Sequence, residues 1–213
     1  AVSVPGSTSL LRKYDLDFCC GGSDTLANAA AEKGLNLAEI ETRLTELQNS
    51  KAENPEEYWV NATYPEIIDH ILVRYHQRHR EQLQELIVLA DRVESVHGDR
   101  EDCPIGVAAE LRNVYEDLSN HMMKEEHVLF PMIKAGNYMM AQMPIRMMEM
   151  EHAEHGEHLD VLKSLTNNMT PPADACNTWR ALYSGIQEFA DDLMMHIHRE
   201  NNILFPRVIA ENH

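Results

Sequence analysis

The sequence has few residues that break helices and contains no long hydrophobic run. Nine glycines and nine prolines in 213 residues leave room for few turns, so we expect long helices. No apolar stretch approaches the roughly 18 residues that a membrane-spanning helix requires. Residues 1–5 show no basic region followed by an apolar stretch, which is the pattern of a secretory signal. We therefore expect neither a membrane protein nor a secreted one.

Cysteine is also scarce. The chain has four cysteines, and two of them, Cys19 and Cys20, are adjacent. This is not the spacing of a small secreted domain held together by disulfides. We therefore expect a protein of the reducing cytoplasm.

Basic residues are too few to balance the acidic ones. There are 18 Lys and Arg against 35 Asp and Glu, which gives a formal net charge of −17. Such a chain is a poor partner for nucleic acid or for an anionic membrane, and we expect it to bind neither. With 44% apolar residues its composition is otherwise that of a globular protein. Histidine is unusually frequent, with 12 residues. These histidines could be an accident of composition, solvent-exposed surface residues, or part of a metal site.

The first part of the chain differs from the rest. Residues 16–22 have the composition of a loop, short helical patterns follow at 23–33 and 36–48, and 49–55 are typical of a linker. We therefore predict a small helical N-terminal domain over residues 1–55.

Residues 56–213 contain four long helical patterns. The first starts near residue 64, because Thr63-x-x-Glu66 is a capping box with Pro65 in the first turn. The second begins near Pro104, the third runs from about Gln142 to Leu165, and the fourth carries an apolar stripe from Trp179 to Ile203. Four long helices with short connections predict an all-α fold, an antiparallel four-helix bundle.

An internal repeat runs through this region. Seven identities in fifteen positions relate residues 117–131 to residues 192–206 at an offset of 75. Residues 76–86 match residues 152–162 more weakly at an offset of 76. The bundle is therefore interpreted as a duplicated helix hairpin, which places equivalent residues symmetrically about its axis.

The repeated residues include two His-x-x-x-Glu pairs on the buried faces of helices. His121 and Glu125 are four positions apart and hence about 40° apart on the helix, as are His196 and Glu200. One such pair is common and usually carries no function. Two buried carboxylates at equivalent positions need cations or protons to neutralise them. Imidazole with carboxylate suits iron, manganese or zinc, and two carboxylates able to bridge favour a dinuclear site.

Other polar residues fall near the same stripes. His76 and His152 match in the repeat and are predicted as further ligands. His79 and His155 also match in the repeat; they are interpreted as ligands, as hydrogen-bond partners of the ligands, or as residues at the edge of the apolar stripe. Tyr75 and Glu151 each precede a predicted ligand and are candidates for hydrogen bonds at the site. The remaining histidines are predicted to be incidental: His127 and His198 point to other faces, and the surface or capping group is His70, His97, His158 and His213.

The pattern His76, His121/Glu125, His152 and His196/Glu200 resembles a hemerythrin-like domain. The chain also resembles, along essentially its whole length, the di-iron iron–sulfur cluster repair proteins. In that family an Asp-Phe/Tyr-Cys-Cys-Gly-Gly motif, here residues 17–22, precedes the hemerythrin-like bundle. The segment from His121 to Pro131 is similar to that family as well.

The resemblance implies two non-haem iron ions per chain. Each would take two histidines and share both glutamates, with an oxo or hydroxo bridge and an open position for nitric oxide or dioxygen. Position 156 is Gly, so the fifth histidine of oxygen-carrying hemerythrins is absent.

The implied function is the repair of iron–sulfur clusters damaged by oxidative and nitrosative stress, with damaged or apo iron–sulfur proteins as partners. Iron donation and redox chemistry on nitrogen oxides both fit this role, so enzymatic turnover stays open. The alternative is a hemerythrin-type carrier or sensor of dioxygen or nitric oxide. A homodimer is also left open.

The adjacent cysteines Cys19 and Cys20 lie in a Gly-flanked segment. Neighbouring cysteines rarely bond to each other, because the ring is strained. We expect exposed thiolates that capture iron, accept nitric oxide or exchange disulfides with a partner. The alternative is a pair of small buried residues. Cys103 and Cys176, near predicted helix starts, are expected to be structural.

Overall fold

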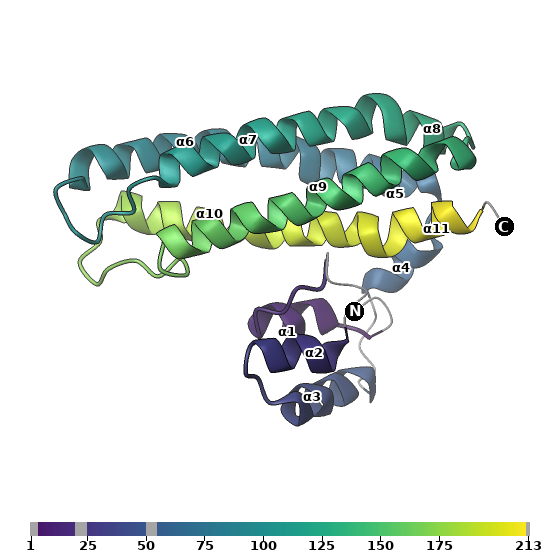
Figure 1. The fold of residues 1–213 in the computed structure, drawn as a ribbon, viewed down its shortest axis with the longest axis horizontal. Coiled ribbons are helices and arrows are strands. Elements are labelled where there is room, and N and C mark those ends of the chain that lie inside the picture. Colours follow the sequence, from purple (N-terminus) through teal and green to yellow (C-terminus); the bar gives the residue numbers. More distant parts are fainter. Residues whose placement is uncertain (1–3, 20–24, 50–54, 212–213) are drawn as a thin grey trace.

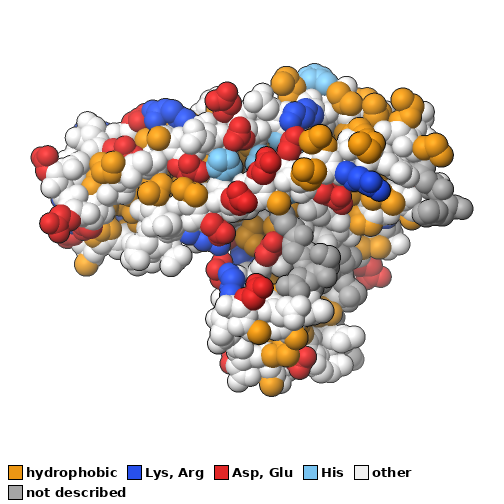
Figure 2. Space-filling model, in the orientation of Figure 1, with side chains coloured by type: hydrophobic (Ala, Val, Ile, Leu, Met, Phe, Trp, Pro, Cys, Tyr) orange, Lys and Arg blue, Asp and Glu red, His pale blue; other side chains and the backbone are white. Residues whose placement is uncertain are grey.

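The computed structural model describes residues 4–19, 25–49 and 55–211. Within these residues the regular elements are all helical, and the long helices lie side by side as a bundle above three short N-terminal helices (Figure 1). The predicted all-α bundle is therefore confirmed. On the face seen in Figure 2, acidic side chains are scattered over the surface and outnumber basic ones. No helix in the described part of the chain is both long and apolar enough to cross a membrane.

The bundle consists of four helical rods joined by short connections, which makes neighbouring rods antiparallel. Helix α6 packs against α7 and α10, and α7 also packs against α9. In chain order the rods are α5 (Tyr64–Ile71), η1 (Leu72–His76) and α6 (Gln77–His97); α7 (Val107–Lys124), η2 (Glu125–Leu129) and α8 (Phe130–Lys134); α9 (Tyr138–Leu165); and α10 (Asn177–Arg199), η3 (Glu200–Leu204) and α11 (Phe205–Ala210).

The helix starts follow local chemistry. The capping box at Thr63 is formed as predicted: Thr63 N donates to Glu66 Oε2 (2.8 Å), and the Glu66 amide donates back to Thr63 Oγ1 (3.4 Å). The second rod begins at Val107, because Gly106 (φ 101°) turns the chain after Pro104. The predicted start at Gln142 is wrong by four residues. Helix α9 continues through Pro144, whose missing N–H removes only one backbone bond near the helix start.

Three rods contain a π-helical turn. These turns are η1, which ends at His76, η2, which begins at Glu125, and η3, which begins at Glu200. The latter two occupy equivalent positions of the repeat. π turns are rare and often mark functional sites. Here each turn coincides with one of the residues predicted to bind metal.

Two apolar clusters fill the bundle, one toward each end. One includes Leu111, Trp179 and Phe189, and the other includes Ile68, Phe130 and Phe205. On each rod the predicted metal ligands lie near the junction of the two clusters; on the second rod, His121 and Glu125 flank Met122 of the first cluster and precede Leu129 of the second. The polar centre is therefore a single layer enclosed by hydrophobic packing on both sides.

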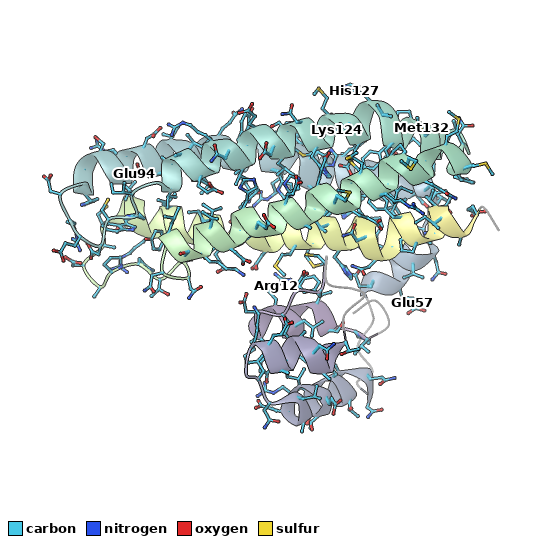
Figure 3. The ribbon with its side chains drawn as sticks, in the orientation of Figure 1. Arg12, Glu57, Glu94, Lys124, His127 and Met132 are labelled. Atoms are coloured by element: carbon cyan, nitrogen blue, oxygen red, sulfur yellow. The ribbon has the colours of Figure 1, made fainter. Side chains whose placement is uncertain are left out.

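The N-terminal unit contains α1 (Ser7–Lys13), α2 (Leu26–Glu32) and α3 (Leu37–Asn49) around a small core of Leu16, Ala30 and Ile40. The sequence patterns did not predict α1 or the short α4 (Pro55–Asn61). Arg12, at the junction of the two parts in Figure 3, pairs with Asp191 of α10 (3.2 Å). The domain boundary at residues 55 and 56 stays a prediction.

Candidate metal centre

The structure brings six of the predicted site residues into one buried layer. They form two overlapping groups, in each of which the candidate ligand atoms lie within 4.8 Å of one another. Glu125 and Glu200 belong to both groups. The first group is completed by His76 and His196, and the second by His121 and His152.

The contacts inside the layer pair the histidines. Nε2 of His76 lies 3.2 Å from Nε2 of His196, and Nε2 of His121 lies 3.1 Å from Nε2 of His152. Glu125 Oε2 lies 3.3 Å from Nε2 of His76 and 3.5 Å from Nε2 of His121, so it stands between the two pairs.

Glu200 spans the same two pairs from the opposite rod. Its Oε2 is 3.1 Å from Nε2 of His152, and its Oε1 is 3.2 Å from Nε2 of His196. The sequence alone did not decide which histidines share a metal. The distances associate His76 with His196 and His121 with His152.

Three of the four carboxylate oxygens lack ordinary hydrogen-bond partners; the fourth, Oε1 of Glu200, pairs with Nε2 of His196 (3.2 Å). Both oxygens of Glu125 and Oε2 of Glu200 are buried, and none accepts a hydrogen bond of acceptable geometry although imidazole nitrogens are close. Leaving buried carboxylate oxygens in this state is costly. The imidazole nitrogens and carboxylate oxygens instead converge on common space, as ligands of a cation do. The donor set therefore fits two metal ions of the iron, manganese or zinc type.

The two carboxylates of the layer shift the pKa values of the histidines beside them. Burial alone would lower the pKa of His152, but Glu200 and Glu125 outweigh it and raise that pKa to about 9. The pKa of His76 is likewise lowered by burial and raised more strongly by Glu125 and Glu126, to about 9. Burial raises the pKa of Glu200, but His196 and His152 hold it well below its usual value. The layer thus attracts positive charge, which metal ions would supply.

Three of the four imidazoles, those of His76, His121 and His152, are oriented by a hydrogen-bond partner on Nδ1. Nδ1–H of His76 donates to Glu126 (2.8 Å), and Nδ1–H of His121 donates to Glu151 (2.9 Å). The bond to its histidine is the largest influence on each of these carboxyls, and it lowers both pKa values to about 2. Such partners fix the ring and leave Nε2 facing the metal. Sequence reasoning selected Glu151 but missed Glu126.

Salt bridges support these two carboxylates from outside. Arg80 Nη2 lies 2.7 Å from Glu126, and Lys124 Nζ lies 2.6 Å from Glu151. Lys124 is labelled on the outer side of the bundle in Figure 3. Each orienting carboxylate is therefore held from two sides, by its histidine and by a cation on the outside of the bundle.

His79 and His155 lie beside the layer rather than in it. The ring of His79 is 5.3 Å from that of His196, and the ring of His155 is 4.8 Å from that of His121. Neither belongs to the two ligand groups. Burial, with help from the neighbouring imidazoles, lowers the pKa of His155 to about 2 and that of His79 well below its usual value. Both therefore stay neutral.

Tyr75 differs from expectation. Its ring stacks on the His196 imidazole, with centroids 5.2 Å apart and planes at 13°, and does not hydrogen-bond a ligand. The π turn that ends at His76 directs the preceding side chain onto the ring of the fourth rod. Tyr75 thus supports a ligand by packing.

Comparison with known proteins places this centre in a family. The model of the hemerythrin HHE cation binding domain matches residues 67–208, and a domain of unknown function matches residues 1–48. A probable iron-sulfur cluster repair protein of Haemophilus influenzae is 68% identical over 211 residues, covering 99% of this chain and 95% of the relative. This chain belongs to the iron–sulfur cluster repair protein family. The iron-sulfur cluster repair proteins YtfE of Musicola paradisiaca and Escherichia coli O81 are 55% and 56% identical, and the matches cover 98% and 99% of this chain and 93% and 94% of those relatives.

One histidine of this repair-family member is not where the sequence predicted. His198 was expected to point away from the core, but it is fully buried. Its ring meets Phe18 edge-on (5.5 Å), and its Nε2 lies 3.7 Å from Glu56. Both partners come from segments N-terminal to the bundle, which cover a face that the helical pattern alone leaves open.

The other incidental histidines lie outside the centre. His127 is exposed and is labelled on the outer side in Figure 3. His158 contacts Glu110 and Asp117, His70 and His97 pack on tryptophans, and His213 is outside the described residues.

The cysteine motif of the repair family is only partly described. Cys19 is 6% exposed, and its Sγ donates to Asp17 Oδ1 (3.1 Å), which corrects the expectation of an exposed thiolate. It lines a cavity of about 320 Å³ between the N-terminal unit and α9. Cys20 lies outside the described residues. Cys103 is buried and Cys176 is exposed; the structural role expected for both stays a prediction.

Proposed function

We propose that this chain repairs iron–sulfur clusters damaged by oxidative and nitrosative stress by means of a di-iron centre. The observation that carries the proposal is the pair of buried ligand groups that share Glu125 and Glu200. Two shared carboxylates are the arrangement that a dinuclear iron site in a helix bundle requires. The relatives are iron–sulfur cluster repair proteins, which favours repair over the carriage or sensing of dioxygen or nitric oxide.

Each residue of the centre has a specific task in this proposal. His76 and His196 would hold one iron, His121 and His152 would hold the other, and Glu125 and Glu200 belong to both ligand groups. When bound, the iron pair supplies redox chemistry and a position for a small ligand such as nitric oxide or dioxygen. The apolar clusters on either side keep bulk water from the layer, so the charge of the carboxylates acts undiminished on the metals.

The histidine-rich donor set bears on the route of repair. Four imidazoles and two carboxylates bind iron less tightly than a carboxylate-rich cage, which suits a centre that gives up its iron. Damaged or apo iron–sulfur proteins are then the partners and acceptors. Redox chemistry on nitrogen oxides at the same centre is the second route. The scarcity of cysteine in the sequence supports the reducing cytoplasm as its location. The homodimer stays a prediction.

Repair is tested with a dehydratase whose cluster has been damaged by nitric oxide. Iron-loaded protein carrying ⁵⁷Fe is mixed with the inactivated enzyme, and activity and transferred label are measured together. We expect activity to return with the wild-type chain and not with the Glu125→Leu variant. Label in the restored cluster indicates donation, and restored activity without label indicates nitrogen-oxide chemistry. Equal restoration by the variant would refute a role for the centre.

The orienting carboxylates give a separate prediction. Glu126→Ala and Glu151→Ala should each lower iron affinity by about 10–100-fold, because the ring of the adjacent ligand loses its fixed orientation. Affinity is measured by competition with a chelator of known strength. Glu116→Ala, an exposed residue of α7, is the control for loss of one negative charge. Unchanged affinity in both variants would contradict the orienting role.

A further inference from the structure

The internal repeat extends beyond the ligands to their partners, with one chemical difference. Glu126 directly follows Glu125 and accepts the Nδ1–H bond of His76. Asn201 directly follows Glu200, and its Oδ1 lies 2.8 Å from Nδ1 of His152. The same position of the repeat thus orients a histidine in both halves, but one half uses a carboxylate and the other an amide.

The amide is explained by a second contact. Nδ2 of Asn201 donates to the backbone carbonyl of Cys19 (3.0 Å). A carbonyl only accepts hydrogen bonds, so a carboxylate at this position could not bind it. Because the NH₂ group of Asn201 points at Cys19, its oxygen is the atom that faces His152. One side chain therefore connects a candidate metal ligand with the cysteine motif.

The next residue provides an internal comparison. Asn202 Nδ2 also reaches this segment, with contacts to the carbonyls of Phe18 (3.2 Å) and Cys19 (3.4 Å). Its other side-chain contact is Nδ1 of His198 (3.0 Å), which is not in either ligand group. Both asparagines hold the same backbone, but only Asn201 also touches the centre.

We propose that Asn201 is a positioning residue that couples the metal-binding imidazole of His152 to the segment Asp17–Cys19, so that iron occupancy controls access to the Cys19 thiol. Iron on Nε2 fixes the His152 ring, the ring fixes Asn201, and Asn201 holds the Cys19 carbonyl. Without iron, the His152 ring lacks the metal bond that would fix it, and the hold of Asn201 on Cys19 weakens. The thiol, which lines the cavity beside α9, then becomes accessible. This inference rests on the proposed role of His152 in binding iron.

The test measures alkylation of Cys19 in the full chain. Cys20, Cys103 and Cys176 are replaced by serine, and reaction with iodoacetamide at fixed pH is followed by mass spectrometry. Protein loaded anaerobically with Fe(II) is compared with metal-free protein, and bound iron is counted in each sample. We expect alkylation to be slower by about fivefold or more when iron is bound, the change that one hydrogen bond produces.

Two variants separate coupling from simple anchoring. Asn201→Asp keeps an acceptor for His152 but cannot donate to Cys19. Bound iron is counted in this variant, and its iron-loaded and metal-free forms are compared. We expect both forms to alkylate at the metal-free rate of the wild type. Asn202→Asp makes the same change one residue later. It should raise the alkylation rate in the iron-loaded and the metal-free state alike, so that the ratio of the two rates stays as in the wild type. Asn201→Ala removes both contacts and should also make the iron-loaded and metal-free rates equal. It replaces the aspartate variant if that variant does not fold.

The outcomes distinguish this inference from the proposed function. A chain that binds no iron would overturn both. A chain that binds two iron ions but alkylates at the same rate with and without them would overturn only the coupling. The coupling would also be overturned if Asn201→Asp and Asn201→Ala both keep the wild-type ratio of metal-free to iron-loaded alkylation rates.

Discussion

Replacing Glu200 with leucine is expected to reduce bound iron from about two ions per chain to nearly none. The carboxylate contacts an imidazole of each pair, His152 and His196, so its loss removes a ligand from both metals at once. Loss of an outer partner costs about 10–100-fold in affinity, and loss of a shared ligand should cost more. Iron is counted by mass spectrometry after anaerobic reconstitution and gel filtration.

The control for this variant is Glu116→Leu. It makes the same change on the exposed face of α7, and it should retain full iron. Circular dichroism verifies that both variants keep their helical content. Full iron in both Glu200→Leu and Glu125→Leu would contradict the shared-ligand role.

Replacing Arg199 with leucine is expected to lower the free energy of unfolding by about 3–5 kcal/mol. Arg199 is 3% exposed, and its Nη1 lies 2.6 Å from Glu56 Oε2, while its guanidinium lies 4.8 Å from the Trp59 ring centre. The leucine would remove this guanidinium from the buried Glu56 carboxylate. Urea denaturation of the metal-free protein measures the change.

A surface pair supplies the comparison. Arg112→Leu breaks an ion pair with Asp91 in which both side chains are about half exposed, and it should cost no more than about 1 kcal/mol. Replacing Glu56 and Arg199 together by leucine should recover much of the loss, because both charges of the buried ion pair are then removed together. Equal costs for Arg199→Leu and Arg112→Leu would show that the buried pair does not hold α4 on the bundle.

The six residues of the centre were accessible to sequence reasoning because of two regularities. Helical periodicity places His121 and Glu125 on one face, and duplication repeats that pair 75 residues later. A buried acid repeated in this way has few explanations besides a cation. Helical periodicity also predicted the bundle, and the capping box Thr63-x-x-Glu66 predicted the start of its first rod near residue 64.

Features that depend on irregular backbone or on distant segments were not predictable in this way. A π turn adds a residue to one turn without changing composition, so η2 and η3 have no signature in the apolar stripe. The burial of His198 depends on Phe18 and Glu56, which lie far away in sequence. Glu126 and Asn201 could have been found, since each directly follows a repeated glutamate.

The central claim, a shared-carboxylate di-iron centre used in repair, is tested most directly by Mössbauer spectroscopy with metal counting. The protein is loaded with ⁵⁷Fe and measured before and after exposure to nitric oxide and to an apo-cluster acceptor. The account predicts about two iron ions per chain, coupled as a pair, whose signal changes with nitric oxide or diminishes as the acceptor gains label. One zinc per chain and no iron, or two uncoupled irons that respond to neither treatment, would contradict it.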